Sequence, residues 1–157
     1  MGLSRDPEVF FLLPMSARRS RSPKITPAHY VTLASWRHAL RRFLLFSQQA
    51  ARAEGIPPQQ HQALLAIKGF PDHEAVTIGA LAARLHLQHH STVGLVNRLA
   101  QRQLVVRSAS VKDRRRVHVR LSARGEALIR RLSAAHLEEL KRLGPLLRSL
   151  INLAEKH

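Results

Sequence analysis

The residues best suited to chemistry in this sequence are the basic side chains between positions 102 and 124. This stretch holds eight lysines and arginines and a single acid, Asp113. The eight are Arg102, Arg107, Lys112, Arg114, Arg115, Arg116, Arg120 and Arg124. A solvated loop usually mixes its charges, so a cluster of one sign predicts a phosphate partner. The net charge of the whole sequence, +16, also favours a polyanion.

Two short segments with strand composition flank the densest part of this cluster. They are residues 104–108 (LVVRS) and 117–121 (VHVRL), and the second alternates apolar and polar residues. Residues 112–116, which hold four of the basic side chains, lie between them. The pattern predicts a β-hairpin with a strongly basic tip.

Two helices separated by a three-residue turn are predicted immediately before the hairpin. Thr77 can cap the first helix, whose apolar positions are spaced i, i+3, i+4 and i+7 from Ile78. Residues 86–88 are too few for more than a turn. The second helix is predicted from about His89 to Arg102, with its inner face formed by Thr92, Leu95, Val96 and Leu99.

The outer face of the second helix is small, polar and partly basic. Such a face suits the DNA major groove better than a protein core. Asn97 lies near the edge of this face, where its amide could pair with the edge of adenine or reach only a phosphate. The predicted DNA-binding residues are His89, His90, Ser91, Val93, Gly94, Asn97 and Arg98 on the helix, and Lys112, Asp113, Arg114, Arg115 and Arg116 in the hairpin tip.

These motifs resemble the MarR family of bacterial winged-helix regulators. Residues 113–122 fit its wing signature, D-x-R followed after five residues by L-[TS], and residues 77–85 and 95–99 resemble its two reader-helix motifs. The resemblance runs from about residue 30 to the C-terminus. Two positions depart from the family pattern: Ala80, where relatives often carry Glu, and Asn97, where Asp is common. The second departure bears on base preference and not on the fold.

For the wing, the resemblance leads us to expect that Asp113 and Arg115 pair and shape the loop. Arg114 and Arg116 would then reach the minor groove or its phosphates. A basic arm over residues 1–25 either adds such contacts or has no role.

A long helix is predicted over residues 26–55, begun by Thr26-Pro27 and ended by Gly55. It carries two apolar stripes, one through Leu33, Trp36, Leu40 and Phe43 and a second at residues 44–46. Both stripes must be buried, and with only seven aromatic residues in the chain a partner subunit is favoured over a single large core. In the family, the first and last helices of two subunits intertwine as the dimer interface.

The remaining helices are predicted from their apolar spacing. A short helix opens at Pro57 with Ala63, Leu64, Leu65 and Ile67 facing inward. After the wing, Ser122 caps another helix, which Gly144-Pro145 stops before a final apolar helix.

We therefore predict a mainly α (α+β) fold, a winged helix-turn-helix with long N- and C-terminal dimerisation helices. The basic arm covers residues 1–25 and a single MarR-like domain covers residues 26–157. Within that domain the dimerisation helices are residues 26–55 and 123–157, and the winged helix-turn-helix is residues 57–122.

Several classes of protein are excluded or disfavoured. With no cysteine there can be no disulfide, cysteine–zinc site or thiol sensor, and no apolar run is long enough to span a membrane. The histidines at 86, 89 and 90 invite a metal, but carboxylate ligands are scarce, so we expect no metal and no cofactor. No catalytic motif is present, so we expect no enzyme, and we expect the cytoplasm as its location.

The resemblance also implies a ligand, because family members often hold phenolic or other aromatic anions between the dimerisation helices and the reader domain. Residues that could line such a site are Trp36, Arg37, Leu40, His61 and Leu65. Alternatively, Trp36 and Leu40 belong to the dimer core. The predicted function is a homodimeric transcriptional regulator, a ligand-responsive repressor that binds a near-palindromic double-stranded DNA operator. The alternative is a basic RNA-binding or architectural protein without operator specificity.

Overall fold

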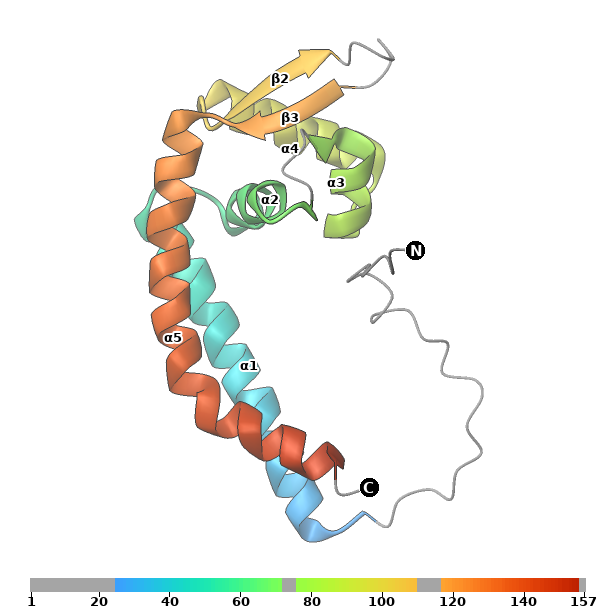
Figure 1. Ribbon diagram of the computed structural model, residues 1–157, viewed down its shortest axis with the longest axis vertical. Helices are drawn as coiled ribbons and strands as arrows, with labels where there is room; N and C mark the ends of the chain where they lie inside the picture. Colours follow the sequence, from blue (N-terminus) through green and yellow to red (C-terminus); the bar gives the residue numbers. More distant parts are fainter. Residues whose placement is uncertain (1–24, 72–75, 110–116, 156–157) are drawn as a thin grey trace, which may run out of the picture.

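The computed structural model describes residues 25–71, 76–109 and 117–155, which form five helices and three short strands (Figure 1). This confirms the predicted mainly helical fold with a small sheet. The predicted arm, apart from Ile25, and the hairpin tip at residues 110–116 lie outside the described residues. The elements are α1 (Pro27–Ala53), α2 (Pro58–Lys68), β1 (Val76–Thr77), α3 (Ile78–Leu85), α4 (His89–Gln101), β2 (Val105–Ala109), β3 (Val117–Leu121) and α5 (Ala123–Glu155).

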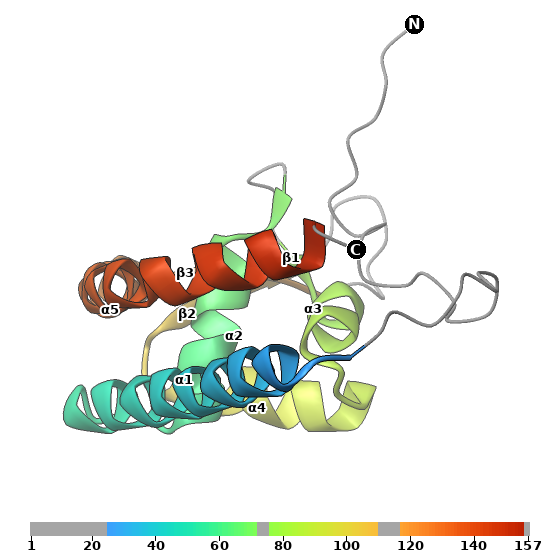
Figure 2. The same cartoon turned by 90° about the horizontal axis from the view of Figure 1, so that it is seen from below.

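The elements gather into two parts. The long helices α1 and α5 run antiparallel beside each other, while α2, α3, α4 and the sheet lie together at one end of this pair (Figure 1). Figure 2, seen from below, shows the two long helices again running alongside each other. None of the described helices is long and apolar enough to cross a membrane.

The sheet is antiparallel with strand order β1-β3-β2. The hairpin prediction is confirmed, with Val105 paired with Leu121 and Ala109 with Val117. The strand β1 was not predicted, because two residues are too few to show an alternating pattern. Its Val76 pairs with Val119 and adds a third strand that ties the start of α3 to the hairpin.

The core lies where α2, α3, α4 and the sheet meet. Its largest fully buried apolar side chains are Leu64, Leu81, Leu95, Val96, Leu99 and Val119. The predicted inner faces of α3 and α4 are therefore confirmed. The first turns of α5 close this core, because Leu128, Ile129 and Leu132 are also buried.

The prediction for α2 is wrong at Leu65, which is 46% exposed. Gln60 and His61 are buried instead. Positions 60, 61, 64 and 67 of the helix point inward. Two polar side chains therefore lie on the buried face of α2, while the apolar side chain of Leu65 lies on its exposed face. The apolar run at 63–67 alone could not indicate this rotation.

The predicted helix break at Gly144-Pro145 is also wrong, since α5 continues through Pro145 to Glu155. A proline inside a helix lacks one N–H donor and its ring pushes on the preceding turn, which either kinks the helix or ends it. Figure 1 shows α5 bending in its C-terminal half. The two helices predicted after the wing therefore form a single helix, α5.

Candidate nucleic-acid interface

The outer face of α4 is exposed, as its apolar spacing predicted. The inner residues Thr92, Leu95, Val96 and Leu99 are each at most 1% exposed, which fixes the rotation of the helix. On the opposite side, Val93 and Gly94 are half-buried and the other predicted residues are exposed. We call this surface, formed by His90, Ser91, Gly94, Asn97 and Arg98, the reader face.

The turn before α4 is set by local hydrogen bonds. His86 ends α3 in the left-handed conformation at φ 52° and ψ 43°. The Thr92 hydroxyl then donates to the carbonyl of Gln88 at 3.1 Å and secures the first turn of α4. At the start of α3, Thr77 Oγ1 accepts from the N–H of Ala80 at 3.2 Å, so the predicted cap is confirmed. The first turn of each helix of the motif therefore contains a hydrogen bond between a threonine side chain and the backbone.

Arg98 lies across Gly94 on the reader face. A Cβ atom placed on Gly94 would be 3.4 Å from Nη1 of Arg98. This is an ordinary van der Waals distance, so alanine would fit at 94, whereas a longer side chain would displace the guanidinium. Because Gly94 has no side chain, little projects from the centre of the reader face and the Arg98 guanidinium lies close to the helix.

Arg107 joins the reader face from strand β2. Its Nη1 donates to Oδ1 of Asn97 at 2.6 Å. Sequence reasoning placed Arg107 in the basic cluster but did not connect it with α4. The signal available was the strand alternation, which puts Arg107 on the same face as the buried Val105.

A cleft of about 540 Å³ lies beside the reader face, between α3, α4 and the hairpin. Arg107 lines it from β2, and His89 and Val93 line it from α4. The full lining is Thr77, Ile78, Gly79, His89, Val93, Arg107 and Val117. The cleft offers two basic side chains next to a polar helix face.

The predicted wing residues Lys112, Asp113, Arg114, Arg115 and Arg116 lie outside the described residues. The two strands that carry them are described up to Ala109 and from Val117, and these two residues pair in the register. The roles of the five remain predictions.

The histidines 86, 89 and 90 are all exposed. Across residues 25–71, 76–109 and 117–155, no three His, Asp or Glu side chains converge on one point that could hold a metal ion. The backbone of His86 adopts the left-handed conformation that ends α3.

Among the five predicted ligand residues, His61 lies away from Trp36 within one chain. His61 is 3% exposed and its ring packs at a tilt of 46° against that of His136, with the ring centroids 4.8 Å apart. His136 Nε2 is 2.9 Å from Ser47 Oγ, and Ser47 follows Trp36 by eleven residues on α1, a rise of about 16 Å. Arg37 and Leu65 are exposed, while Trp36 and Leu40 are half-buried.

The buried imidazole of His61 is neutral at pH 7. Burial, with a smaller contribution from neighbouring His136, lowers the pKa of His61 to about 4. Among the described residues, neither Nδ1 of His61 nor Oε1 of Gln60 has a hydrogen-bond partner. His136 itself is well held, because its Nδ1 lies 2.6 Å from the carbonyl of Leu132 and must donate to it.

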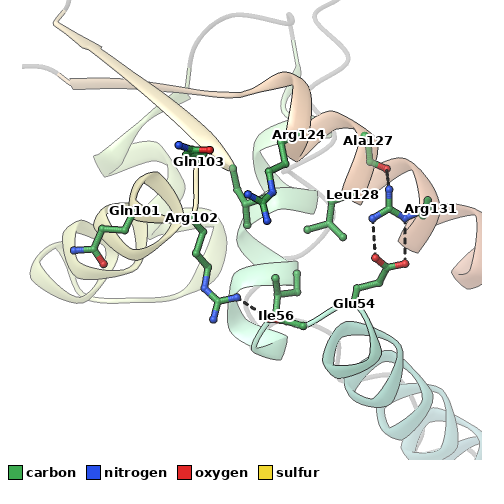
Figure 3. A pocket seen from close by; sticks show the side chains of 11 residues that line it. Glu54, Ile56, Gln101, Arg102, Gln103, Arg124, Ala127, Leu128 and Arg131 are labelled. Carbon is green, nitrogen blue, oxygen red and sulfur yellow. Dashed lines mark hydrogen bonds and ion pairs between the residues drawn. The ribbon is translucent and has the colours of Figure 1, made fainter.

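A second basic cleft, of about 400 Å³, lies where α1, α4 and α5 meet (Figure 3). Glu54 accepts from Arg131 through both carboxylate oxygens, at 3.1 and 2.7 Å, and this contact lowers the pKa of Glu54. Arg102 Nη1 donates to the carbonyl of Gly55 at 2.6 Å. The side chain of Arg124 extends between Arg102 and Leu128 (Figure 3). Because Glu54 neutralises only Arg131, this junction cleft suits a small anion.

Known proteins share both the sequence pattern and the fold described above. A family model described as "MarR family" matches residues 54–116. The winged-helix region is therefore similar to the MarR family in sequence. MarR family members are DNA-binding transcription regulators and not enzymes, which agrees with the predictions from the sequence. Among curated protein sequences, none matches this chain.

Solved structures of this family have the same fold at low sequence identity. MepR, the transcription regulator of the Staphylococcus aureus multidrug efflux pump MepA, has a TM-score of 0.66 at 16% identity, covering 84% of this chain and 96% of its own. AbsC from Streptomyces coelicolor has a TM-score of 0.62 at 16% identity, covering 84% and 95%. BpsR from Bordetella bronchiseptica, whose DNA binding is regulated by 6-hydroxynicotinic acid, has a TM-score of 0.59 at 21% identity, covering 80% and 97%. MepR has also been solved with DNA, and that structure has a TM-score of 0.61 at 16% identity, covering 85% and 97%.

Proposed function

We propose that this protein binds double-stranded DNA as a homodimer at near-palindromic sites and acts as a repressor in the cytoplasm. The observation that carries the proposal is the reader face. An exposed, small and polar helix surface is backed by fully buried residues and bordered by Arg107 and a hairpin that leads to a basic tip. A helix of this kind fits the major groove, while the hairpin extends along the backbone.

The dimer is supported by the long helices. Within one chain, α1 and α5 leave large apolar side chains exposed, including Leu45 at 56% and Leu137 at 60%. An apolar surface of this kind is usually covered by another molecule. A second copy is the simplest partner because it would pair two reader faces on one DNA. Repression would follow from occupancy, since a bound dimer excludes other proteins from the same site.

The test compares labelled 30-bp duplexes of one mixed sequence, made as DNA and as RNA, by fluorescence anisotropy over a range of salt concentrations. We expect tighter binding to DNA, weakening linearly in log–log form as salt increases. Equal or tighter binding to RNA would favour the basic RNA-binding alternative. No binding to DNA at low salt would contradict the proposal.

The wing provides a sharper version of the same test. Arg114→Ala and Arg116→Ala should each lower the log–log salt slope by about 0.9 if each residue contacts one phosphate. A larger loss on A·T-rich duplexes would indicate an arginine in a narrow minor groove. An unchanged slope in both variants would remove the two residues from the interface.

We also propose that a small aromatic carboxylate or phenolate controls DNA binding. The junction cleft supports an anion, because Arg102 and Arg124 form no ion pair among the described residues and Glu54, which also lines the cleft, pairs with Arg131. The cleft also joins the reader helix to both long helices. The set Trp36, Arg37, Leu40, His61 and Leu65 is the alternative site. A ligand acts by binding one spacing of the two reader faces better than another.

Thermal unfolding with benzoate, salicylate and nicotinate, each followed by DNA binding, tests the ligand and its location. We expect at least one of them to raise the melting temperature and weaken DNA binding. Loss of that shift in Arg124→Ala but not in Trp36→Ala would place the site at the junction cleft, and the reverse result would place it at the long helices. No shift with any aromatic acid would contradict ligand control.

A further inference from the structure

We infer that Arg107 contacts the DNA backbone and that Asn97 is the residue that positions it. This inference rests on the proposed function and refines it. It adds Arg107 to the interface, and it replaces both contacts considered for Asn97, with an adenine edge or with a phosphate, by a positioning role.

The register of the hairpin aims Arg107 at α4. Arg107 pairs with Val119, which is fully buried, and directly paired residues lie on the same face of an antiparallel sheet. Arg107 therefore lies on the core side of the hairpin, two residues beyond the buried Val105. Arg120 pairs with Val106, which is 39% exposed, and both lie on the opposite face.

The hydrogen bond to Asn97 holds this cation without neutralising it. Nη1 of Arg107 is 2.6 Å from the amide oxygen of Asn97, a short contact of the kind made by a charged donor. Among the described residues no carboxylate pairs with Arg107. The full positive charge therefore remains at the edge of the reader face.

The position of the guanidinium suits a phosphate. Arg107 lines the cleft with Val93 and His89 and bonds to Asn97, so it lies along one edge of α4. Phosphates form the rims of the major groove on both sides of an inserted helix, and contacts to them fix the register of the protein. The remaining nitrogens of the planar guanidinium can donate to two phosphate oxygens at once.

The same contact argues against base reading by Asn97. Recognition of adenine by an asparagine uses both its oxygen and its nitrogen. The oxygen of Asn97 already accepts from Arg107. A positioning role uses the contact that exists, whereas base reading would require it to be shared or broken.

The first experiment measures the salt dependence of binding to the 30-bp mixed-sequence DNA duplex. Arg107→Ala should weaken binding and lower the log–log slope by about 0.9, because one phosphate contact is lost. Arg120→Ala is the matched control, with the same charge removed from the opposite face of the same hairpin, and its slope should stay at the wild-type value. An equal loss in Arg120→Ala would show a general effect of charge and overturn the inference.

The second experiment separates positioning from direct contact. Asn97→Ala should weaken binding about fivefold in the wild type, as expected for a lost hydrogen bond, and should have no further effect in Arg107→Ala. Asn97→Asp should keep the contact but neutralise the cation, so its slope should fall as in Arg107→Ala. Both positions are exposed, and melting temperatures will confirm that the variants fold.

The outcomes distinguish this inference from the proposed function. If the wild type does not bind the duplex, the proposed function fails. If the wild type binds with a steep salt slope and Arg107→Ala keeps that slope, only the inference about Arg107 fails. If Asn97→Ala weakens binding equally with and without Arg107, Asn97 contacts DNA itself and the positioning role is overturned.

Discussion

The two parts of this molecule differ in what they leave on the surface. In the reader unit, residues 76–109 and 117–121, Val106 is the one large apolar side chain that is exposed, and the others are buried or half-buried within the chain. The long helices α1 and α5 expose eight large apolar residues among those described. These are Tyr30, Val31, Leu33, Leu44 and Leu45 on α1, and Leu137, Leu140 and Ile151 on α5.

This difference indicates which part is complete in one chain. The reader unit has a closed core and a polar outer face, which suits a polar, charged partner such as DNA. The long helices contribute to the core where they approach α2, and beyond that region they expose apolar side chains. Such exposed apolar side chains suit a partner like the helices themselves. We therefore propose that assembly and DNA binding use separate surfaces, so that changes to one can be compared with changes to the other.

The largest expected effect is on assembly. Leu137→Glu places a charge on the exposed apolar face of α5 and should convert a dimer of two 17.7-kDa chains to a monomer in light scattering. Val106→Glu, an exposed apolar residue of the reader unit, should leave the mass unchanged. A wild-type monomer at micromolar concentration, or loss of the dimer in Val106→Glu, would contradict the assignment of the two surfaces.

The next effect is the pH dependence of stability where α2 meets α5. His61 has its pKa lowered to about 4 from 6.5, so the unfolded chain takes up a proton as the pH falls through 6.5 and the folded chain does not. The free energy of unfolding should therefore fall between pH 6.5 and 4, by up to about 3 kcal/mol. Urea unfolding across this range measures it.

His61→Leu should make the stability curve flatter between pH 6.5 and 4. His90→Leu, on the exposed reader face, serves as the control and should keep the wild-type curve. A His61→Leu curve that falls as steeply as the wild type would mean that His61 does not resist protonation in the folded state.

The smallest of these effects compares glycines in the two parts. A Cβ on Gly125, in the first turn of α5, would be 2.1 Å from the carbonyl oxygen of Leu104, so Gly125→Ala must shift backbone and should cost about 1–3 kcal/mol. A Cβ on Gly79 in α3 would meet nothing within 4 Å. Gly79→Ala should be neutral or stabilise by up to about 1 kcal/mol, because alanine favours helix. Equal effects in denaturant unfolding would contradict the close packing at Gly125.

What could be predicted from the sequence depended on whether the signal was local. Helices α3 and α4 were predicted because their apolar residues recur at helical spacing and Thr77 caps the first, and the hairpin because β3 alternates. Gly55 ended α1 as expected, with a positive φ of 74°. Each of these signals lies within one element.

The misses come from contacts between elements. The burial of His61 and the exposure of Leu65 depend on how α2 rotates against α5, and β1 exists only through its pairing with β3. The continuation of α5 through Pro145 depends on the helix that follows. The Asn97–Arg107 contact and the junction cleft join residues from separate elements, and no spacing in the sequence relates them.

The central claim is that a dimer presents two reader faces to one DNA, and selection from a random duplex library tests it most directly. Bound duplexes are recovered and sequenced over several rounds with the wild-type protein. We expect enrichment of an inverted repeat whose half-sites are about one helical turn, roughly 10 bp, apart or a multiple of that. Recovery of sequences without a shared motif, or of a motif without two-fold symmetry, would contradict the account.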